Sequence, residues 1–405
     1  MIGGTLNDKN ILTVNAGSSS IKLVLFEATT PPKRILEATI EKIGWPEPRL
    51  VVKRLGNSES ISRPAQAADH TAAATILMNL IKQEIQPDKL LAIGHRVVHG
   101  GPKYSQSQLV TQDVLDELKK LADFDPEHLP IELQLIEAFG RSFAGAAQVA
   151  CFDTAFHHDL PTVARLLPIP LHYEKQGVRR YGFHGLSYTF LMQALAHQAG
   201  ADIADGRVIL AHLGNGASLA AVHGGKSIDT SMGFTPSSGI PMSTRTGDLD
   251  PGLALYLVQS QGIDEFNKMV NFQSGLLGMS ETSSDMEKLL QIEDSDSRAA
   301  DAIALFCYQV KKCIGSYAAA LGGLDTLVFA GGIGENAPKV RARICEDLDF
   351  LGITIDKSRN EGNEALISSD NSLVAVRVIH TDEAMTIARE AQQILGGAYG
   401  NEPTR

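Results

Sequence analysis

The chain has few cysteines, few aromatic residues and little clustered positive charge. Among its 405 residues, four are cysteine, one is tryptophan and 6% are aromatic. The cysteines have neither the spacing of metal ligands nor the density of a disulfide scaffold, so we expect a reduced, cytoplasmic environment. The formal net charge is -11. This argues against nucleic acid as a partner, because a phosphate backbone is bound by clustered Lys and Arg.

Long apolar runs are also missing. No stretch approaches the roughly 20 apolar residues of a membrane span. The first ten residues, MIGGTLNDKN, contain neither the basic segment nor the apolar stretch of a signal peptide, so we expect no leader and no membrane partner. With 43% hydrophobic and 20% charged residues, the composition is that of an ordinary globular protein with length for two or three domains.

Two parts of the sequence share one plan of short strands joined by glycine-rich turns. Apolar residues alternate with polar ones in each strand, and the first turn of each part is rich in small polar residues. The repeat predicts a duplicated βββα domain. The expected strands are 10–15, 20–26 and 35–43 in the first part, and 207–213, 217–223 and 226–229 in the second.

Helical patterns follow each group of strands, which predicts an α/β protein whose two domains enclose a ligand-binding cleft. Asp250 before Pro251 is typical of a helix N-cap. Residues 326–344 predict a strand, a glycine turn and a helix, an arrangement that favours a ligand at the helix N-terminus. The expected helices are 71–85, 109–122, 186–200, 297–323 and a last one from near Thr381 to Gly396.

The stretch NAGSSSIKLVLF at 15–26 has two interpretations. Gly17 and the serines are turn residues, which favours a plain hairpin. The same residues offer several N–H and O–H donors that could surround a phosphate.

The stretch GHRVVHGG at 94–101 places Arg96 between two histidines. His95 and His99 have the spacing of zinc ligands on a helix, but the valines and glycines favour a strand, which makes zinc the weaker alternative. An arginine with such apolar neighbours needs an anion. FDTAFHHDLP supplies Asp153 at a strand end, and RRYGFHGLSY supplies His184. Taken alone, each histidine is more typical of a hydrogen-bonded core residue than of a catalyst.

Residues 231–252 pack Gly, Pro, Ser and Thr around Arg245. A long irregular segment of this kind is commonly functional. Isolated arginines, glycine-rich hairpins and carboxylates suited to Mg²⁺ together indicate phosphoryl transfer. The sequence has no G-x-x-x-x-G-K-[ST], so it is not a P-loop kinase.

Nine ordered motifs across nearly the whole chain resemble the acetate kinase family. They are TVNAGSSSIK, GHRVVHGG, FDTAFH, RRYGFHGLSY, AHLGNGAS, DTSMGFTP, MSTRTGDLDPG, FAGGIGEN and TDEAMTIA. The resemblance implies the duplicated actin-like fold of the acetate and sugar kinase, Hsp70 and actin superfamily, with ribonuclease H-like domains. It also implies reversible phosphoryl transfer from ATP to acetate, giving acetyl phosphate and ADP, a requirement for Mg²⁺ or Mn²⁺, and a homodimer.

The resemblance also implies roles for residues. The catalytic residues would be Arg96, His128, Asp153, His184 and Arg245, with Arg96 and Arg245 on the carboxylate and the transferring phosphoryl group. Asn15 and Glu383, with Asp153, would position Mg²⁺ and its waters. Val98, Phe183 and Pro236 would surround the acyl methyl group. The nucleotide would contact Ser18, Ser20, Lys22, His212, Leu213, Gly214, Asn215, Gly216, Asp285, Met286, Glu287, Gly331, Gly332, Ile333, Gly334 and Asn336.

Several departures from the family pattern fall near these positions. Glu127 stands where an apolar residue is usual, and Thr235–Ile240 also differ, which leaves propionate or another short-chain acid as an alternative substrate. Asp285-Met286-Glu287 replaces Asp-Phe-Arg, and Ser284 with Glu287 predicts a capping box. A non-metabolic actin-like ATPase is the alternative from another class. The expected domains are 1–154 with 383–405, and 155–382, the latter binding nucleotide.

Overall fold

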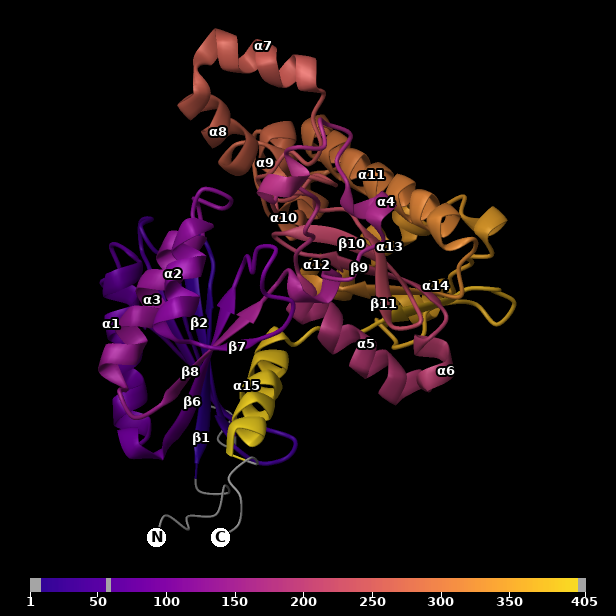
Figure 1. Ribbon diagram of the computed structural model, residues 1–405. Helices are drawn as coiled ribbons and strands as arrows, with labels where there is room; N and C mark the ends of the chain where they lie inside the picture. The colour runs from indigo at the N-terminus through magenta and orange to yellow at the C-terminus, as the bar shows by residue number, and fades with distance from the viewer. Residues whose placement is uncertain (1–8, 56–59, 400–405) are drawn as a thin grey trace. The chain divides into compact units, whose positions relative to one another are not determined.

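The computed structural model describes residues 9–55 and 60–399. The chain forms two compact units: unit 1 is Met1–Ala155 with Asp382–Arg405, and unit 2 is Phe156–Thr381. Figure 1 shows both, coloured along the chain. The first eight residues, on which the absence of a leader was argued, lie outside the described residues. In the described part of the chain, every helix is too short or too polar to cross a membrane.

Unit 1 is built on an eight-stranded sheet with the order β5-β4-β3-β2-β1-β6-β8-β7. The strands β1 to β3 form an antiparallel meander, whereas β1, β6 and β8 are parallel. The elements are β1 (Asn10–Ala16), β2 (Ser20–Glu27), β3 (Lys33–Glu41), β4 (Arg49–Arg54), β5 (Ser60–Pro64), α1 (His70–Glu84), η2 (Pro87–Lys89), β6 (Leu90–Val97), β7 (Gln108–Leu109), α2 (Gln112–Lys120), α3 (Leu129–Ser142), β8 (Ala147–Phe152) and α15 (Glu383–Tyr399).

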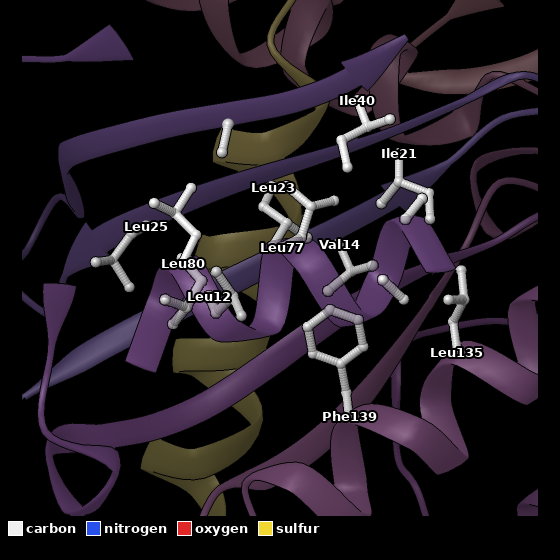
Figure 2. Packing of buried hydrophobic residues seen from close by; sticks show 14 of the residues in the cluster. Leu12, Val14, Ile21, Leu23, Leu25, Ile40, Leu77, Leu80, Leu135 and Phe139 are labelled. Atoms are coloured by element: carbon white, nitrogen blue, oxygen red, sulfur yellow. The ribbon is translucent and has the colours of Figure 1, made fainter. Parts of the chain in front are cut away.

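The core of unit 1 lies between the sheet and helices α1 and α3. Alternate residues such as Leu12 and Leu23 point from the strands toward Leu77 of α1 and Phe139 of α3 (Figure 2), and all four are fully buried. Asp69 begins α1 by accepting the N–H of Ala72. The alternating apolar residues seen in the sequence therefore form the face of the sheet that packs against α1 and α3.

Helix α15 covers the other face of this sheet and contacts β1, β6 and β8. Its approach to β6 is close at Gly94, where an added Cβ would lie 2.4 Å from the Cγ2 atom of Ile387. Only glycine therefore lets the helix pack against the strand at this point.

Unit 2 contains a five-stranded sheet with the order β11-β10-β9-β12-β13. Helix α5 packs on β9, and the long α11 packs on β9, β10 and β11. The elements are η3 (Ala155–His157), α4 (Thr162–Arg165), η4 (Glu174–Gln176), α5 (Gly185–Ala199), α6 (Ala201–Ala204), β9 (Arg207–Leu213), β10 (Ala217–His223), β11 (Lys226–Thr230), α7 (Pro251–Gln261), α8 (Ile263–Phe272), α9 (Gly275–Ser280), α10 (Met286–Ile292), α11 (Ser297–Leu321), β12 (Thr326–Ala330), α12 (Gly331–Asn336), α13 (Pro338–Cys345), η5 (Asp349–Leu351), α14 (Lys357–Glu361) and β13 (Ala375–Val378).

Two local predictions were wrong. The predicted glycine turn after β12 is itself helical, since Gly331 begins α12 directly after the strand. Helix α10 is capped by Asp285, whose side chain accepts the N–H of Glu287, and not by a Ser284 capping box. Asp285 is the cap because its carboxylate reaches the N–H of Glu287, two residues ahead.

The other predicted strands and helices are present, with ends that differ by a few residues. Asp250 caps α7 as predicted, by accepting the N–H of Leu253.

Candidate active site

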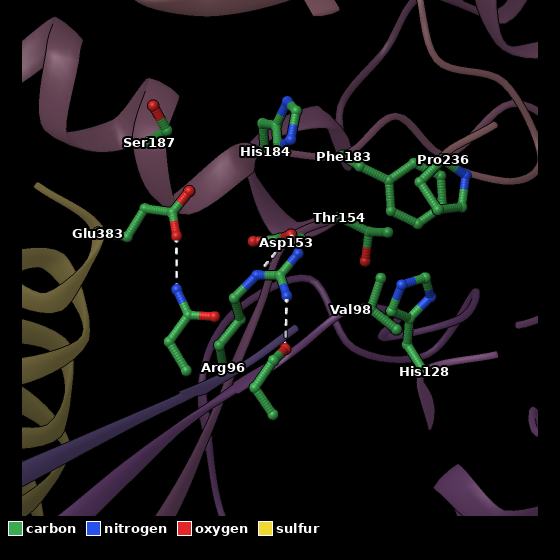
Figure 3. A network of polar contacts seen from close by, with 12 residues as sticks. Arg96, Val98, His128, Asp153, Thr154, Phe183, His184, Ser187, Pro236 and Glu383 are labelled. Atoms are coloured by element: carbon green, nitrogen blue, oxygen red, sulfur yellow. Dashed lines mark hydrogen bonds and ion pairs between the residues drawn. The ribbon is translucent and has the colours of Figure 1, made fainter. Parts of the chain in front are cut away.

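Arg96 lies at the end of β6 beside Asp153, which follows β8. The strands are parallel and in register, with Arg96 opposite Cys151, so their carboxyl ends meet at one edge of the sheet. Nε and Nη2 of Arg96 donate to Oδ2 of Asp153 at 3.0 and 2.6 Å, and Nη1 donates to the carbonyl oxygen of Ala16 at 3.3 Å. Figure 3 shows this pair. The sequence placed Asp153 at a strand end and favoured a strand around Arg96, and the structure brings the two side chains together.

A second carboxyl group, Glu132, lies on the other side of Arg96. It is in the first turn of α3, and its side chain is only 2% exposed. Its Oε2 accepts the N–H of Val98 at 2.9 Å, and its Oε1 lies 3.8 Å from Nη1 of Arg96. Burial raises the pKa of Glu132 to about 8, although Arg96 and the Val98 N–H oppose the shift. Sequence reasoning missed Glu132; the available signal was a lone acidic residue on the apolar face of α3.

The charge of Arg96 is secured by these carboxyl groups. Burial alone would lower the pKa of Arg96, but the carboxylates of Asp153 and Glu383 outweigh burial and hold the pKa above its ordinary value, and Glu132 adds to this effect when it is ionised. Arg96 thus presents a permanent, nearly buried positive charge. A planar guanidinium of this kind binds a carboxylate or a phosphoryl group through two parallel hydrogen bonds.

His128 and Val98 lie near Arg96 in unit 1 (Figure 3). His128 immediately precedes α3, and its ring Nδ1 lies 2.9 Å from Oδ1 of Asp125. Val98 is 1% exposed. Glu127, the unusual acidic residue, is half-buried in the turn before α3.

Asn15 and Glu383 are brought together from opposite ends of the chain. Nδ2 of Asn15, at the end of β1, donates to Oε2 of Glu383, the first residue of α15, at 2.7 Å. Ser18 and Ser20 lie in and after the turn between β1 and β2, which is closed by the N–H of Gly17 donating to the carbonyl of Ser20. Lys22 lies opposite Asn15 on β2. The stretch NAGSSS therefore forms a hairpin turn whose polar side chains remain accessible.

The residues at this hairpin are compatible with Mg²⁺ in its usual form. Among residues 9–55 and 60–399, no cluster of three or more His, Cys, Asp or Glu side chains is arranged to hold a metal ion by itself. Mg²⁺ on a nucleotide commonly takes one or two carboxylates, with waters and phosphate oxygens completing its coordination. The carboxylate of Glu383 and the amide oxygen of Asn15 are donors of that chemical type.

In unit 2, His184 and Arg245 converge on Gly216. An added Cβ at Gly216 would lie 3.0 Å from Nε2 of His184 and 3.8 Å from Nη1 of Arg245. His184 directly precedes α5 in a left-handed conformation, with φ of 60°, and its ring stacks on His212 of β9 with centroids 4.3 Å apart. Arg245 donates to the carbonyl of Pro236 at 3.0 Å. The irregular segment and the RRYGFHGLSY motif thus place two nitrogen-rich side chains at one glycine.

The glycines of the second hairpin lie beside those of α12. An added Cβ at Gly331, where φ is 75°, would lie 2.7 Å from the carbonyl oxygen of Leu213. One at Gly214 would lie 3.8 Å from the N–H nitrogen of Gly332. Asn336 closes α12 by donating to the carbonyl of Gly332. Glycine is therefore required at Gly331, whereas a Cβ at Gly214 would make only ordinary contact with the start of α12. Asn215 is exposed, Ile333 is half-buried and Gly334 is buried.

The remaining predicted residues of unit 2 have mixed exposure. Asp285 and Glu287 are exposed at the start of α10, whereas Met286 is only 3% exposed. Phe183 is buried, and its carbonyl lies 3.1 Å from Nε2 of the buried His157. Pro236 is also buried.

Arg341 of α13 is a further residue that the sequence reasoning missed. It is fully buried, and its guanidinium donates to carbonyl oxygens at the end of α12.

The sequence profile of the Acetokinase family matches residues 10–389. The chain belongs to the acetokinase family. A protein named propionate kinase from Citrobacter rodentium is 41% identical over 95% of this chain and 96% of its own length. One named acetate kinase from Rhodopseudomonas palustris is 42% identical over 96% of this chain and 98% of its own.

Solved structures of the acetokinase family agree. Acetate kinase from Porphyromonas gingivalis has a TM-score of 0.85 and 36% identity, covering 96% of this chain and all (100%) of that one. Propionate kinase from Francisella tularensis has a TM-score of 0.87 and 37% identity, covering 95% and 100%. The predicted family, the duplicated actin-like α/β fold and the kinase class are confirmed.

Proposed function

We propose that this acetokinase family member transfers the γ-phosphoryl group of ATP to the carboxylate of a short-chain acid, with acetate as first substrate. The observation that carries the proposal is Arg96, a nearly buried guanidinium kept charged by Asp153 and Glu383 beside the apolar Val98. A small acid has the same two parts, an anionic head and an apolar tail.

Each group of residues has a proposed role in the reaction. Arg96 holds the acid, one of whose carboxylate oxygens attacks the γ-phosphorus while the bond from phosphorus to the ADP oxygen breaks. His184 and Arg245 donate to the phosphoryl oxygens, whose charge must be stabilised in the transition state. His128 and Asp153 complete the catalytic set. Mg²⁺, when bound with the nucleotide, would neutralise phosphate charge.

The nucleotide is assigned to the hairpin between β9 and β10, to the start of α12 and to the first hairpin of unit 1. The close approach of Gly214 to Gly332 supports this, because backbone N–H groups free of side chains can surround phosphate oxygens. Asn15 and Glu383 are proposed to hold Mg²⁺, or Mn²⁺ in its place. Because most of the residues assigned to the nucleotide belong to unit 2, this unit would carry most of the nucleotide site.

Propionate is the second candidate acid. Relatives named propionate kinase are 41% and 43% identical, and one named acetate kinase is 42% identical, so overall identity does not separate them. The acyl pocket is assigned to Val98, Phe183 and Pro236. Its volume would decide whether acetate or propionate is the preferred acid.

The test is an acyl phosphate assay with hydroxylamine as trap, using acids from formate to butyrate, ATP and Mg²⁺. Formation of an acyl hydroxamate is expected with acetate or propionate and is expected to stop in excess chelator. ATP hydrolysis without a trapped product would favour an actin-like ATPase instead. Full activity in excess chelator would contradict the metal assignment, and Glu383→Ala is expected to weaken the apparent metal affinity.

A homodimer is also proposed, on the exposed apolar surface of α7 and α8. Helix α7 has no buried residue, and Leu255, Tyr256 and Ile263 are 59%, 66% and 70% exposed. Large apolar side chains gathered in this way commonly mark a protein interface. Light scattering of the wild type and of Tyr256→Asp should give a dimer and a monomer. A monomeric wild type would contradict the proposal.

The low cysteine content supports a cytoplasmic location.

A further inference from the structure

A buried pair of hydroxyl groups lies behind the ring of His184. Oγ of Ser218, on β10, lies 2.9 Å from Nδ1 of His184 and 2.5 Å from the hydroxyl oxygen of Tyr188, on α5. Ser218 and Tyr188 are both 0% exposed. Because water does not reach these groups, their protons must find acceptors within the protein.

Counting donors fixes the direction of the bond between Tyr188 and Ser218. A tyrosine hydroxyl has one proton, and burial raises the pKa of Tyr188 well above its ordinary value, so the proton stays on. Among the residues that the structure describes, Oγ of Ser218 is the acceptor within reach. A buried O–H without an acceptor is costly, so Tyr188 donates to Ser218.

The same count applies to Ser218. Its single proton must go to one of its two neighbours in the described structure, Tyr188 or His184. Because Tyr188 is already the donor of their shared bond, the proton of Ser218 goes to Nδ1 of His184. A neutral imidazole that accepts at Nδ1 carries its proton on Nε2.

We infer that Ser218 is a positioning residue that holds His184 in the tautomer with its proton on Nε2. Nε2 is the nitrogen closest to the Cβ position of Gly216, where Arg245 also converges. The inference rests on the proposed function, in which His184 donates a hydrogen bond to the transferring phosphoryl group. In the opposite tautomer, Nε2 would turn a lone pair toward phosphoryl oxygens.

His212 offers a matched contrast within the same ring stack. Its Nδ1 lies 2.8 Å from Oγ of Ser187, which lies 2.7 Å from Oγ1 of Thr381. Thr381 is half-buried, so water can accept its proton or donate to it. The direction of the bonds around Ser187 is therefore not fixed by the same count, and Ser187→Ala serves as the control.

The direct test is the ¹⁵N spectrum of the histidine rings in the full chain, with His184 assigned from His184→Gln. The wild type should show His184 protonated at Nε2. Ser218→Ala should populate both tautomers, Ser218→Thr should keep the wild-type signals, and Ser187→Ala should leave the His184 signals unchanged. A wild-type His184 protonated at Nδ1 overturns the inference, even if every variant fails to fold.

Kinetics then test the consequence. Losing one neutral hydrogen bond that orients His184 should lower kcat of Ser218→Ala by about tenfold, with KM for ATP and acid little changed, and Ser218→Thr should restore it. A fall in kcat without a change in tautomer overturns the positioning role. Normal turnover in His184→Gln would instead refute the role proposed for His184 and leave the tautomer result standing.

Discussion

Two arginines, one in each unit, use their hydrogen-bond donors differently: Arg341 is fully buried, and the side chain of Arg96 is 15% exposed. Arg341 donates all five guanidinium N–H groups, to the carbonyls of Gly334, Glu335 and Asn360 and to the side chains of Asn360 and Asn363. Arg96 makes three such bonds among the described residues, to Asp153 and Ala16. Arg341 is saturated, whereas Arg96 keeps donors for a ligand.

Their partners also differ in charge. The acceptors of Arg341 are neutral, and burial lowers its pKa to about 10. Carboxyl groups surround Arg96 and hold its pKa above the ordinary value. The comparison teaches that a buried arginine with saturated neutral acceptors serves the fold, while one with counter-charges and unused donors can serve a substrate.

Arg96→Ala should give the largest effect on activity. We expect turnover to fall by about a hundredfold or more, because the guanidinium is proposed to meet charge that develops in the transition state. The variant should still fold, since Asp153 can take up a proton when the cation is gone and Glu132, with a pKa of about 8, is already mostly protonated at neutral pH. Arg245→Ala should behave in the same way. Near-normal turnover in either variant, measured with the hydroxylamine trap, would remove that arginine from the mechanism.

Arg341→Ala should instead act on stability. Leaving several buried oxygens without donors should lower the free energy of unfolding by about 3 to 5 kcal/mol, seen as a lower urea midpoint. Turnover per folded molecule should fall far less than in Arg96→Ala. Arg341→Lys, which keeps the charge but offers fewer donors, should lie between. A variant as stable as wild type would show that the saturated network is dispensable.

Glu132→Gln should change how stability depends on pH. The pKa of Glu132 is about 8 in the folded protein, against an ordinary value of 4.5. Between these values the folded state binds more protons than the unfolded state, so this contribution to stability is complete below about pH 4.5 and is lost as pH rises to about 8. The variant does not titrate, so its stability relative to wild type should rise over that range.

Urea unfolding at several pH values measures this difference. Glu127→Gln, in the turn before α3, is the matched control. Parallel pH profiles for wild type and Glu132→Gln would mean that Glu132 is ionised in the folded protein and that three charges meet at Arg96.

Glu127→Leu should have the smallest effect. If the Glu127 carboxylate faced the acyl site, it would repel the substrate by roughly one to a few kcal/mol, and its removal would lower the KM for acetate. We expect the carboxylate to point away from the acyl site, since a charge buried beside an apolar pocket is costly. KM should then be unchanged for acetate and propionate. A clear fall in KM would mean that the Glu127 carboxylate faces the acyl site and is a further negative group near Arg96.

The sequence predicted most strands and helices because their apolar periodicity is strong, as in Leu12, Leu23 and Leu77, whose alternation or helical spacing follows directly from burial. It predicted Asp153 at the end of a strand and a strand around Arg96. It missed Glu132 and Arg341, because the burial of a charged side chain depends on partners far along the chain. Arg341 donates to Gly334 of α12, to Asn360 of α14 and to Asn363 just after α14, and no local sequence pattern indicates these contacts.

The cap of α10 failed for a local reason. Ser284 and Asp285 are both good caps, and the choice between them depends on where the backbone turns into the helix.

The close contact between Gly94 and Ile387 also bears on the order in which the protein is made. Residues 156–381 are contiguous, whereas the sheet of unit 1 is synthesised before them and lacks α15 until residues 383–399 have been made. One face of the β1–β6 pair therefore stays without its helix until unit 2 has been synthesised. Unit 1 is therefore begun before unit 2 and completed after it, and a ribosome that stalls before residue 383 leaves a nascent protein whose β1, β6 and β8 lack the helix that covers them.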